Sequence, residues 1–258
     1  MSFLAIDIGN TRLKWALFDT VSPHAHMLAH GAVFLETIDH LAESDWKALP
    51  APTRMLGCVV AGEAVKRRAE EQMEIWDITP RWVVSGERSA GVTNGYDHPN
   101  RLGADRWMAL IGARARLMRG AIARPALVVM VGTAVTVEAI DMQGKFLGGI
   151  ILPGINLSLQ ALHEHAARLP RVEIRDPGRV IGKDTVTAMQ SGIYWGSIEM
   201  IEGLCRRIRE EYGKPMKTVA TGGVASLFEG AFPTIDHFDQ DLTSRGLLEI
   251  FRRNGGKL

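Results

Sequence analysis

Asp7-Ile8-Gly9-Asn10-Thr11-Arg12-Leu13-Lys14 is the stretch of this chain that decides the fold. It joins two apolar runs, Phe3–Ile6 and Trp15–Phe18, through a polar turn with Gly-Asn at its centre, and this pattern predicts a tight β-hairpin. The turn offers a carboxylate, an amide, a hydroxyl, an ammonium and free backbone N–H groups. Backbone amides and Lys14 suit phosphate oxygens, while Asp7 suits a magnesium ion that keeps most of its waters. An ordinary hairpin turn is the alternative, because such turns are common.

The composition is that of an ordinary globular protein, with 46% hydrophobic and 23% charged residues in a chain of 258. The net charge of +1 creates no field that attracts nucleic acid or a membrane, so neither is expected as a partner. The two cysteines form no metal-binding spacing, and their low number fits a reducing compartment. The N-terminus enters a strand without a basic leader, and no window approaches the roughly 18 apolar residues of a membrane span. We therefore expect a cytoplasmic protein.

The predicted elements repeat in the two halves of the chain. In the first half we expect five strands and two helices, followed by a bridging helix: Phe3–Ile8, Leu13–Phe18, His26–Val33, Arg54–Val60 and Arg81–Val84, with Thr37–Ala48 and Gly62–Trp76, then Leu102–Leu117. In the second half we expect the strands Leu127–Val131, Val135–Asp141, Phe146–Leu152 and Thr218–Ala220, with the helical segments Ile155–Ala166, Asp184–Tyr212, Ala225–Glu229 and Leu242–Asn254.

Both halves thus open with three strands and a helix, and each carries a glycine turn after its first strand. This is a repeat in topology rather than in residue identity. The sequence predicts an α/β protein with two domains, residues 1–118 and 119–258, that face each other across a ligand-binding cleft.

Two further glycine turns follow strands in the second half. Gly132-Thr133-Ala134 mirrors the first turn and offers amides and a hydroxyl to a second phosphate. Thr221-Gly222-Gly223 precedes a helical run, and its glycines allow the backbone to approach a ligand closely. Each of these is also compatible with a plain turn, but the three turns together are more specific than any one of them.

Gly103-Ala104-Asp105-Arg106-Trp107 is the best candidate for catalysis. The apolar residues that follow have helical spacing, which places Asp105 in the first helical turn, where the helix dipole favours an ionised carboxylate. Such a carboxylate can accept a hydrogen bond from a substrate hydroxyl and orient it for attack. A first-turn Asp that only stabilises its helix is the alternative, and Arg106 is equally compatible with a surface arginine. Just upstream, Tyr96 lies in a turn-rich loop and offers an aromatic wall, although it could simply pack under that loop.

Taken together, these motifs resemble those of the type III pantothenate kinase family, in the actin-like superfamily of sugar kinases and heat-shock ATPases. The resemblance covers nearly the whole chain, and the segment from Tyr96 through Pro99 to Trp107 is its most family-specific part. The glycine-rich segment 148–154 and the segment 185–192 also fit. The resemblance implies two actin-like, ribonuclease H-like domains and ATP-dependent phosphorylation of the pantothenate hydroxyl, the first committed step toward coenzyme A.

The resemblance also implies roles for single residues. Asp105 is expected to be the general base, and Asp7 to organise Mg²⁺. The substrate-binding set is Tyr96, Gly103, Ala104, Asp105, Arg106 and Thr185, the last reaching the substrate of the other subunit in a homodimer with a shared pantothenate pocket. The ATP-binding set is Asp7, Ile8, Gly9, Asn10, Thr11, Arg12, Leu13, Lys14, Thr133, Gly222 and Gly223.

Two positions depart from the family pattern. Met130 occupies a position where the family usually carries an Asp that helps to bind K⁺ or NH₄⁺, and Glu138 stands where the family tends to Asp. A thioether is a poor ligand for a hard cation, so we expect the monovalent-cation site not to survive in its usual form. Two other functions stay open: an actin-like kinase for another small hydroxylated substrate, and a regulatory or accessory protein that has kept the fold.

Overall fold

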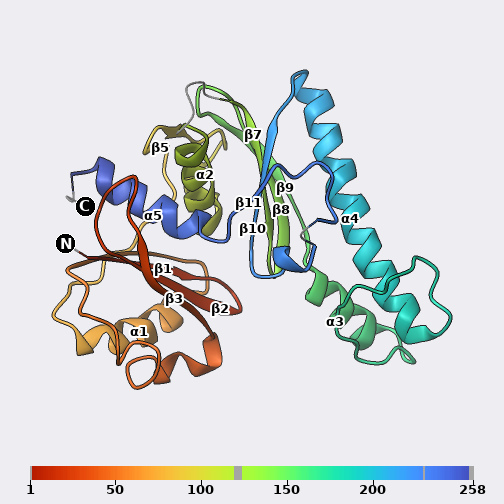
Figure 1. Ribbon diagram of the computed structural model, residues 1–258, viewed down its shortest axis with the longest axis horizontal. Helices are drawn as coiled ribbons and strands as arrows, with labels where there is room; N and C mark the ends of the chain where they lie inside the picture. Colours follow the sequence, from red (N-terminus) through yellow and green to blue (C-terminus); the bar gives the residue numbers. More distant parts are fainter. Residues whose placement is uncertain (1, 119–123, 229, 256–258) are drawn as a thin grey trace. The chain divides into compact units, whose positions relative to one another are not determined.

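The computed structural model describes residues 2–118, 124–228 and 230–255, which form two compact units. The first unit is drawn from residues 1–121 and 241–258, and the second from residues 122–240. Each unit is built on its own β-sheet (Figure 1).

The first sheet is formed by β1 (Phe3–Ile8), β2 (Arg12–Phe18), β3 (Met27–Phe34) and β4 (Arg54–Val59), in the order β3-β2-β1-β4. The first three strands form an antiparallel meander, and β4 runs parallel to β1. Side chains alternate between the two faces of a strand, so Leu4, Ile6 and Ile8 share one face while Phe3, Ala5 and Asp7 share the other.

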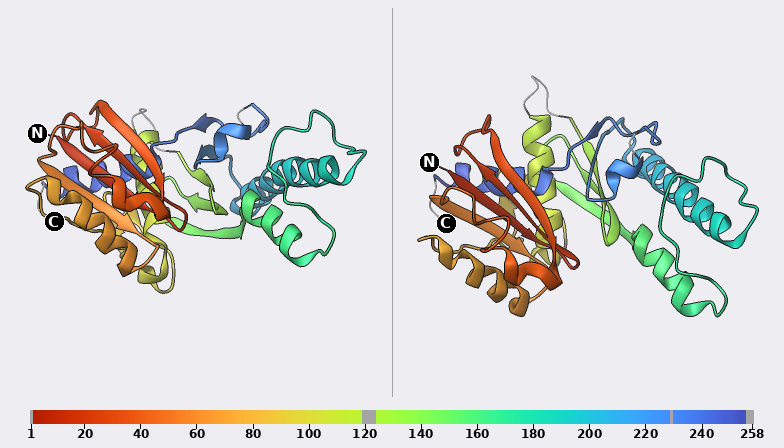
Figure 2. Two further views of the ribbon diagram at one scale, coloured as in Figure 1. Left: turned by 90° about the horizontal axis from the view of Figure 1, so that it is seen from below. Right: turned by 60° about the horizontal axis from the view of Figure 1, so that its bottom comes forward.

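Helices cover both faces of the first sheet. On the face of Ile6 lie η1 (Leu35–His40), α1 (Glu63–Gln72) and η2 (Met73–Ile75), whose buried apolar residues form one core with the strands. On the opposite face lie α2 (Ala104–Leu117) and α5 (Leu242–Arg253), and the ring of Phe251 on α5 is 5.0 Å from that of Phe3. Figures 1 and 2 show α1 and α5 on opposite sides of this sheet.

Helices α2 and α5 pack against each other at two glycines. A Cβ on Gly112 would lie 2.0 Å from the backbone oxygen of Leu242, and a Cβ on Gly246 would lie 2.0 Å from that of Met108. Only glycine allows the backbones to approach so closely. The C-terminal helix therefore belongs to the first unit, which differs from the sequence-based division into residues 1–118 and 119–258.

The second sheet repeats the topology of the first. It contains β7 (Ala126–Val131), β8 (Ala134–Ile140), β9 (Phe146–Pro153), β10 (Lys217–Thr221) and β11 (His237–Phe238), in the order β11-β10-β7-β8-β9. An antiparallel meander of β7, β8 and β9 is again extended by a strand, β10, that is parallel to the first. The predicted topological repeat is confirmed.

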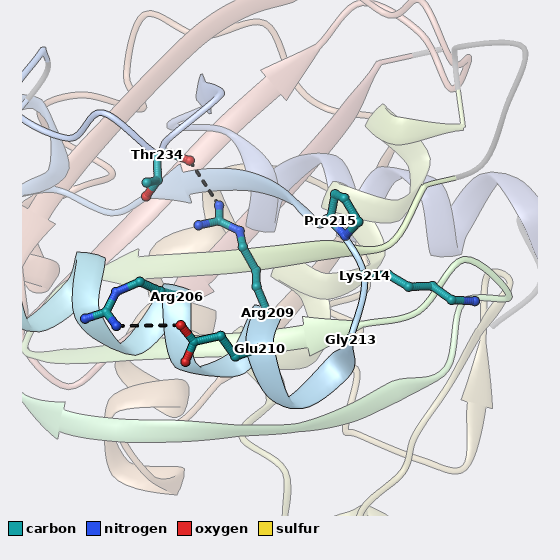
Figure 3. Close-up of a pocket in the computed structure, with 7 residues that line it drawn as sticks. All are labelled: Arg206, Arg209, Glu210, Gly213, Lys214, Pro215 and Thr234. Atoms are coloured by element: carbon teal, nitrogen blue, oxygen red, sulfur yellow. Dashed lines mark hydrogen bonds and ion pairs between the residues drawn. The ribbon is translucent and has the colours of Figure 1, made fainter.

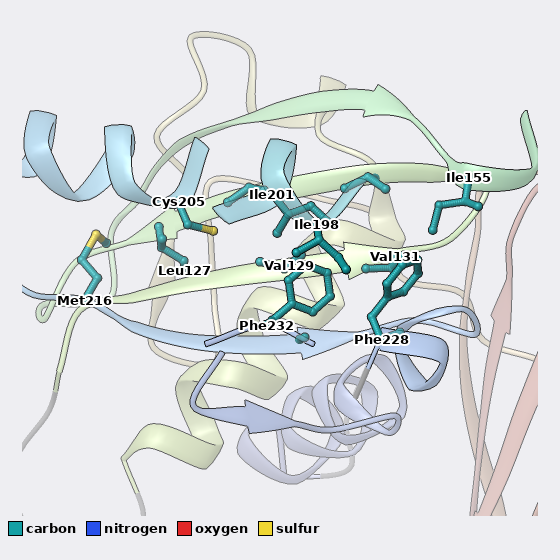
Figure 4. Close-up of a cluster of buried hydrophobic side chains, with 14 of the residues drawn as sticks. Leu127, Val129, Val131, Ile155, Ile198, Ile201, Cys205, Met216, Phe228 and Phe232 are labelled. Carbon is teal, nitrogen blue, oxygen red and sulfur yellow. The ribbon is translucent and has the colours of Figure 1, made fainter. Parts of the chain in front are cut away.

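One face of the second sheet carries a core of alternating residues. Val129, Val131 and their neighbours pack against Ile198 and Ile201 of α4 (Thr185–Tyr212), as Figure 4 shows. Asp184 begins this helix with a reciprocal capping box to Thr187, and Gly213 ends it in the left-handed conformation. The remaining elements of this unit are α3 (Ile155–His165) and η4 (Ala225–Phe228).

Two predicted elements of the first half are wrong. The segment Thr37–Ala48 is not one helix, since η1 ends at His40 and turns follow. The apolar pattern does not distinguish the two, because Ile38, Leu41 and Trp46 can be buried by a helix or by a series of turns. The segment Arg81–Val84 is not a strand, since Trp82 forms only an isolated parallel bridge to Gly57 and Val84 is largely exposed.

The predicted run Ala225–Glu229 is a 3-10 turn at Ala225–Phe228, and residue 229 lies outside the described residues. No helix in the described part of the chain is both long and apolar enough to cross a membrane.

Candidate active site

Three strands of the first unit bring Lys14, Asp7 and Cys58 to the same level of the sheet. Asp7 on β1 pairs with Lys14 on the antiparallel β2 and with Cys58 on the parallel β4. All three point to the face that α2 and α5 cover. Phe3 contacts α5 on that face, and Asp7 lies four residues after Phe3 on the same strand, so its side chain points the same way, as do those of its partners on the neighbouring strands. The thiol of Cys58 donates a hydrogen bond to Oδ1 of Asp7 over 3.5 Å.

Asp7 is a buried carboxyl group at the end of an apolar strand, with 9% of its surface exposed. The pKa of Asp7 is raised to about 6: burial is the largest cause and the carboxylate of Asp105 adds to it, while the ammonium of Lys14 and the thiol of Cys58 lower the pKa. Asp7 and Asp105 are far apart in the sequence, and in the folded protein their carboxylates interact electrostatically.

The turn between β1 and β2 is closed by a hydrogen bond from the backbone N–H of Gly9 to the oxygen of Arg12. Asn10, Thr11 and Arg12 are exposed there, so their polar groups are accessible. Ile8 and Leu13, by contrast, bury their side chains in the core, and only their backbone groups could meet a ligand.

Asp105 lies in the first turn of α2, as its sequence context predicts. Its Oδ1 accepts a hydrogen bond from the backbone N–H of Arg106 over 2.8 Å. Gly103 precedes the helix, and a Cβ there would lie 2.7 Å from the same Oδ1. The glycine therefore leaves room for this orientation of the carboxylate, and Ala104 beside it is buried.

Arg106 is buried rather than a surface arginine, with 7% of its surface exposed. Its Nη2 donates to the hydroxyl of Tyr96 over 3.0 Å, and its guanidinium carbon lies 5.6 Å from the centre of the Tyr96 ring. The structure thus brings together the predicted pair of substrate-binding side chains, and both flank the start of α2.

The two glycine turns of the second unit lie side by side. Gly132 N–H donates to Ala134 and closes the first turn, where Thr133 is exposed. In the second turn Gly222 has φ +113°, and its Cβ would lie 2.3 Å from the backbone oxygen of Val131, just before the first turn. Gly223 is exposed and has open space around it.

Thr185 and Met130 also belong to the second unit. Thr185 is exposed at the first residue of α4. Met130 on β7 has Thr136 and Thr221 as its partners on the neighbouring strands. The hydroxyl of Thr136 is buried and has no hydrogen-bond partner among the described residues.

A cavity of about 550 Å³ lies elsewhere in the second unit, at the end of α4, and contains none of the predicted site residues (Figure 3). Two of its basic side chains have partners within the unit. Arg209 donates to the backbone oxygen of Met216 and of Thr234 and to the hydroxyl of Thr218, while Arg206 pairs with Glu210.

Two residues beside the site were missed by reasoning from the sequence. Cys58 contacts Asp7, which lies 51 residues away in the sequence, and this contact depends on the register of two strands. Asn94 lies in the turn-rich loop, where it is buried and its side-chain amide is fully hydrogen-bonded. In a loop rich in turn residues, the local sequence does not distinguish an Asn that only forms a turn from one whose side chain holds the loop by hydrogen bonds.

The donor set of the first unit fits magnesium held together with a nucleotide. Among the described residues, no group of three or more His, Cys, Asp or Glu side chains is arranged to hold a metal ion. Asp7 supplies one hard carboxylate, and Mg²⁺ commonly takes one or two carboxylates, several waters and substrate phosphates. An ion bound there would neutralise phosphate charge.

The fold is that of the actin-like kinases and their relatives. A Sinorhizobium meliloti protein that carries the name of a 2-dehydro-3-deoxygalactonokinase aligns with 98% of this chain and 99% of its own, with a TM-score of 0.60 and 14% identity. The ethanolamine utilization protein EutJ from Carboxydothermus hydrogenoformans aligns with 97% of this chain and 90% of its own, with a TM-score of 0.57 and 11% identity.

Sequence comparison identifies the family. The family model for type III pantothenate kinase matches residues 3–207. Type III pantothenate kinases from Polaromonas sp. and Acidovorax ebreus are each 51% identical to this chain, and the alignments cover 98% and 100% of it and 98% and 99% of the relatives. The chain belongs to the type III pantothenate kinase family.

Proposed function

We propose that this protein transfers the γ-phosphoryl group of ATP to the hydroxyl of pantothenate, giving 4'-phosphopantothenate in the first step of coenzyme A biosynthesis. The observation that carries the proposal is that Asp7 points to the face of the first sheet that α2 covers, where the Asp105 carboxylate in the first turn of that helix raises the pKa of Asp7. One carboxylate would serve the nucleotide and the other the acceptor hydroxyl. Membership of the family supports the same substrate pair.

On the acceptor side, Asp105 would accept a hydrogen bond from the attacking hydroxyl and orient it. An ordinary Asp is a weak base toward an alcohol, so orientation would contribute much of the effect and proton transfer would come late. Arg106 and Tyr96 would bind pantothenate, with the guanidinium placed to meet the substrate carboxylate. Gly103 and Ala104 would bring the backbone close to the same substrate.

On the nucleotide side, the turn Gly9–Arg12 and Lys14 would hold phosphate oxygens through N–H groups and charge. Asp7 would hold Mg²⁺. Thr133, Gly222 and Gly223 of the second unit would supply a hydroxyl and close backbone approach. Phosphoryl transfer depends mainly on positioning and charge neutralisation, and this set of groups supplies both.

We further propose that activity does not require K⁺ or NH₄⁺. Met130 is a poor ligand for a hard cation, and its cross-strand partners Thr136 and Thr221 offer only neutral hydroxyls. Phosphorylation measured in a buffer free of both ions should match that measured with added K⁺. Strict dependence on either ion would contradict the assignment.

We also propose that the enzyme is a cytoplasmic homodimer in which Thr185 reaches the pantothenate bound to the other subunit. Exposed Thr185 at the start of α4 suits such a role, and Ile181, Val180 and Val186 nearby are exposed apolar side chains that suit burial in a subunit contact. Two free, buried cysteines suit a reducing compartment. Sedimentation of a single monomeric species at micromolar concentration would rule out the dimer.

The activity is tested by following ATP consumption with pantothenate, with a panel of hexoses and without an acceptor. Turnover with pantothenate alone is expected. Turnover with a hexose instead would identify a sugar kinase, and the absence of any acceptor-dependent turnover would favour an accessory protein on this fold. Neither a nucleic acid nor a membrane is proposed as a partner.

A further inference from the structure

The loop that carries Tyr96 has little regular structure of its own. Between Ser85 and Gly103 the chain forms only the two-residue strands β5 (Arg88–Ser89) and β6 (Val92–Thr93) and the short helix η3 (Pro99–Arg101). A loop of this kind needs other bonds to hold a side chain in place. One closes its ends, from the Ser85 hydroxyl to the backbone oxygen of Leu102 over 2.6 Å.

Asn94 supplies the bonds inside the loop. Its side-chain nitrogen donates to the backbone oxygen of Gly86 over 3.2 Å and to that of Pro99 over 3.0 Å. Its side-chain oxygen accepts from the backbone N–H of Tyr96 over 3.0 Å. Both N–H groups and the oxygen of the amide are therefore used, and only 8% of the residue is exposed.

These bonds link the parts of the loop that meet at Tyr96. Gly86 begins the loop, Pro99 begins η3 on the way to Gly103 and Asp105, and Tyr96 itself is fixed at its backbone. The hydroxyl of Tyr96 is in turn held by Arg106. A buried side-chain amide whose donors and acceptor are all hydrogen-bonded has one favoured orientation, so it holds the backbone groups of its partners in fixed positions.

We propose that Asn94 is a positioning residue for pantothenate binding, acting through Tyr96 and the approach to the start of α2. The inference rests on the proposed role of Tyr96 and Arg106 in the acceptor site. Asn94 itself need not touch the substrate. Its amide sets where the Tyr96 ring stands against the Arg106 guanidinium.

The test uses Asn94→Asp, which keeps the shape of the side chain but replaces the donor nitrogen by an oxygen that faces the backbone oxygens of Gly86 and Pro99, together with the milder Asn94→Ala. In both variants we expect KM for pantothenate to rise at least about tenfold, since tenfold already corresponds to roughly one buried hydrogen bond and each variant loses at least two, while KM for ATP changes less than about twofold. Asn100→Ala, an exposed residue of the same loop, is the matched control and should leave both constants unchanged.

A double-mutant cycle shows whether Asn94 acts through Tyr96. In a Tyr96→Ala background, Asn94→Ala should add little to the KM for pantothenate, because the group that it positions is gone. Fully additive effects would overturn the inference. Wild-type enzyme that does not phosphorylate pantothenate would instead overturn the proposed function.

Hydrogen exchange gives a readout that needs no activity. In Asn94→Ala the backbone amide of Tyr96 should exchange faster, since it loses the acceptor Oδ1, while the amide of Trp107 inside α2 keeps its wild-type rate. Equal acceleration at both sites would show general loosening of the unit, and unchanged exchange at Tyr96 would show that the bond does not hold the loop. Either result contradicts the proposal.

Discussion

The thiol of Cys58 donates to the carboxylate of Asp7 on the neighbouring strand, and both groups are buried on the face of the first sheet that α2 covers. A carboxylate in such a place is costly to ionise, because it exchanges water for one weak donor and the more distant charge of Lys14. A cation bound at the site would stabilise the ionised carboxylate and so offset the free-energy cost of its burial. The first two predictions follow from this pair.

Asp7→Asn should stabilise the protein at neutral pH in the absence of Mg²⁺ and ATP. The pKa of Asp7 is about 6 in the folded protein against 3.8 as the ordinary value. The folded state therefore binds the proton more tightly, and the stability that protonation gives is lost as pH rises through about 4 to 6. Above that range, the variant should exceed wild type by up to about 3 kcal/mol in free energy of unfolding.

Urea unfolding of both proteins at several values between pH 5 and pH 8 checks this expectation. The difference should shrink as the pH falls toward 5. Asp45→Asn, which changes an exposed carboxylate of the same unit, is the control. A difference that is independent of pH would mean that the ionisation of Asp7 has no part in it.

Neither thiol should react in the folded protein. Burial, and then the carboxylates of Asp7 and Asp105, raise the pKa of Cys58 well above its ordinary value, and burial raises the pKa of Cys205 to about 11. The reactive species is the thiolate, so an aromatic disulfide reagent should find no fast thiol at pH 8 and both thiols after denaturation. Cys205→Ser identifies which of them reacts. Rapid labelling of Cys58 in the native state would refute its burial.

Asp105→Asn should lower kcat by at least about a hundredfold while leaving ATP affinity nearly intact. The amide keeps an oxygen for the Arg106 N–H but removes the negative charge that would orient the acceptor hydroxyl. Steady-state kinetics with pantothenate, together with calorimetric titration of nucleotide, separate the two effects. A near-normal kcat would remove Asp105 from the catalytic role.

Gly112→Ala should destabilise the first unit. Its Cβ would press on the backbone of α5, and overpacking of this kind costs roughly 1–3 kcal/mol or more. The matched control is Gly203→Ala on α4, where the Cβ meets open space and the helical preference of alanine should add up to about 1 kcal/mol. Denaturant midpoints of the two variants should move in opposite directions. A stable Gly112→Ala variant would show that α2 and α5 can separate without cost.

Reasoning from the sequence succeeded where the signal is local. The hairpin around Gly9, the first-turn position of Asp105 and the long helix ending at Tyr212 are set by apolar periodicity and by turn and capping residues. It failed where the same spacing of apolar residues is compatible with two different structures. The buried anchors Ile38, Leu41 and Trp46 satisfy a helix and a series of turns equally well.

By itself, the sequence determined the repeated strand order, the three glycine turns and the residue types that phosphoryl transfer needs. Tertiary structure alone decided that Cys58 meets Asp7, that Asp105 lies close enough to raise the pKa of Asp7, that Arg106 is buried against Tyr96, and that α5 packs on α2. The reason is physical. Turns and caps depend on neighbours along the chain, whereas strand register, burial and the close approach of two helices depend on residues that only folding brings together.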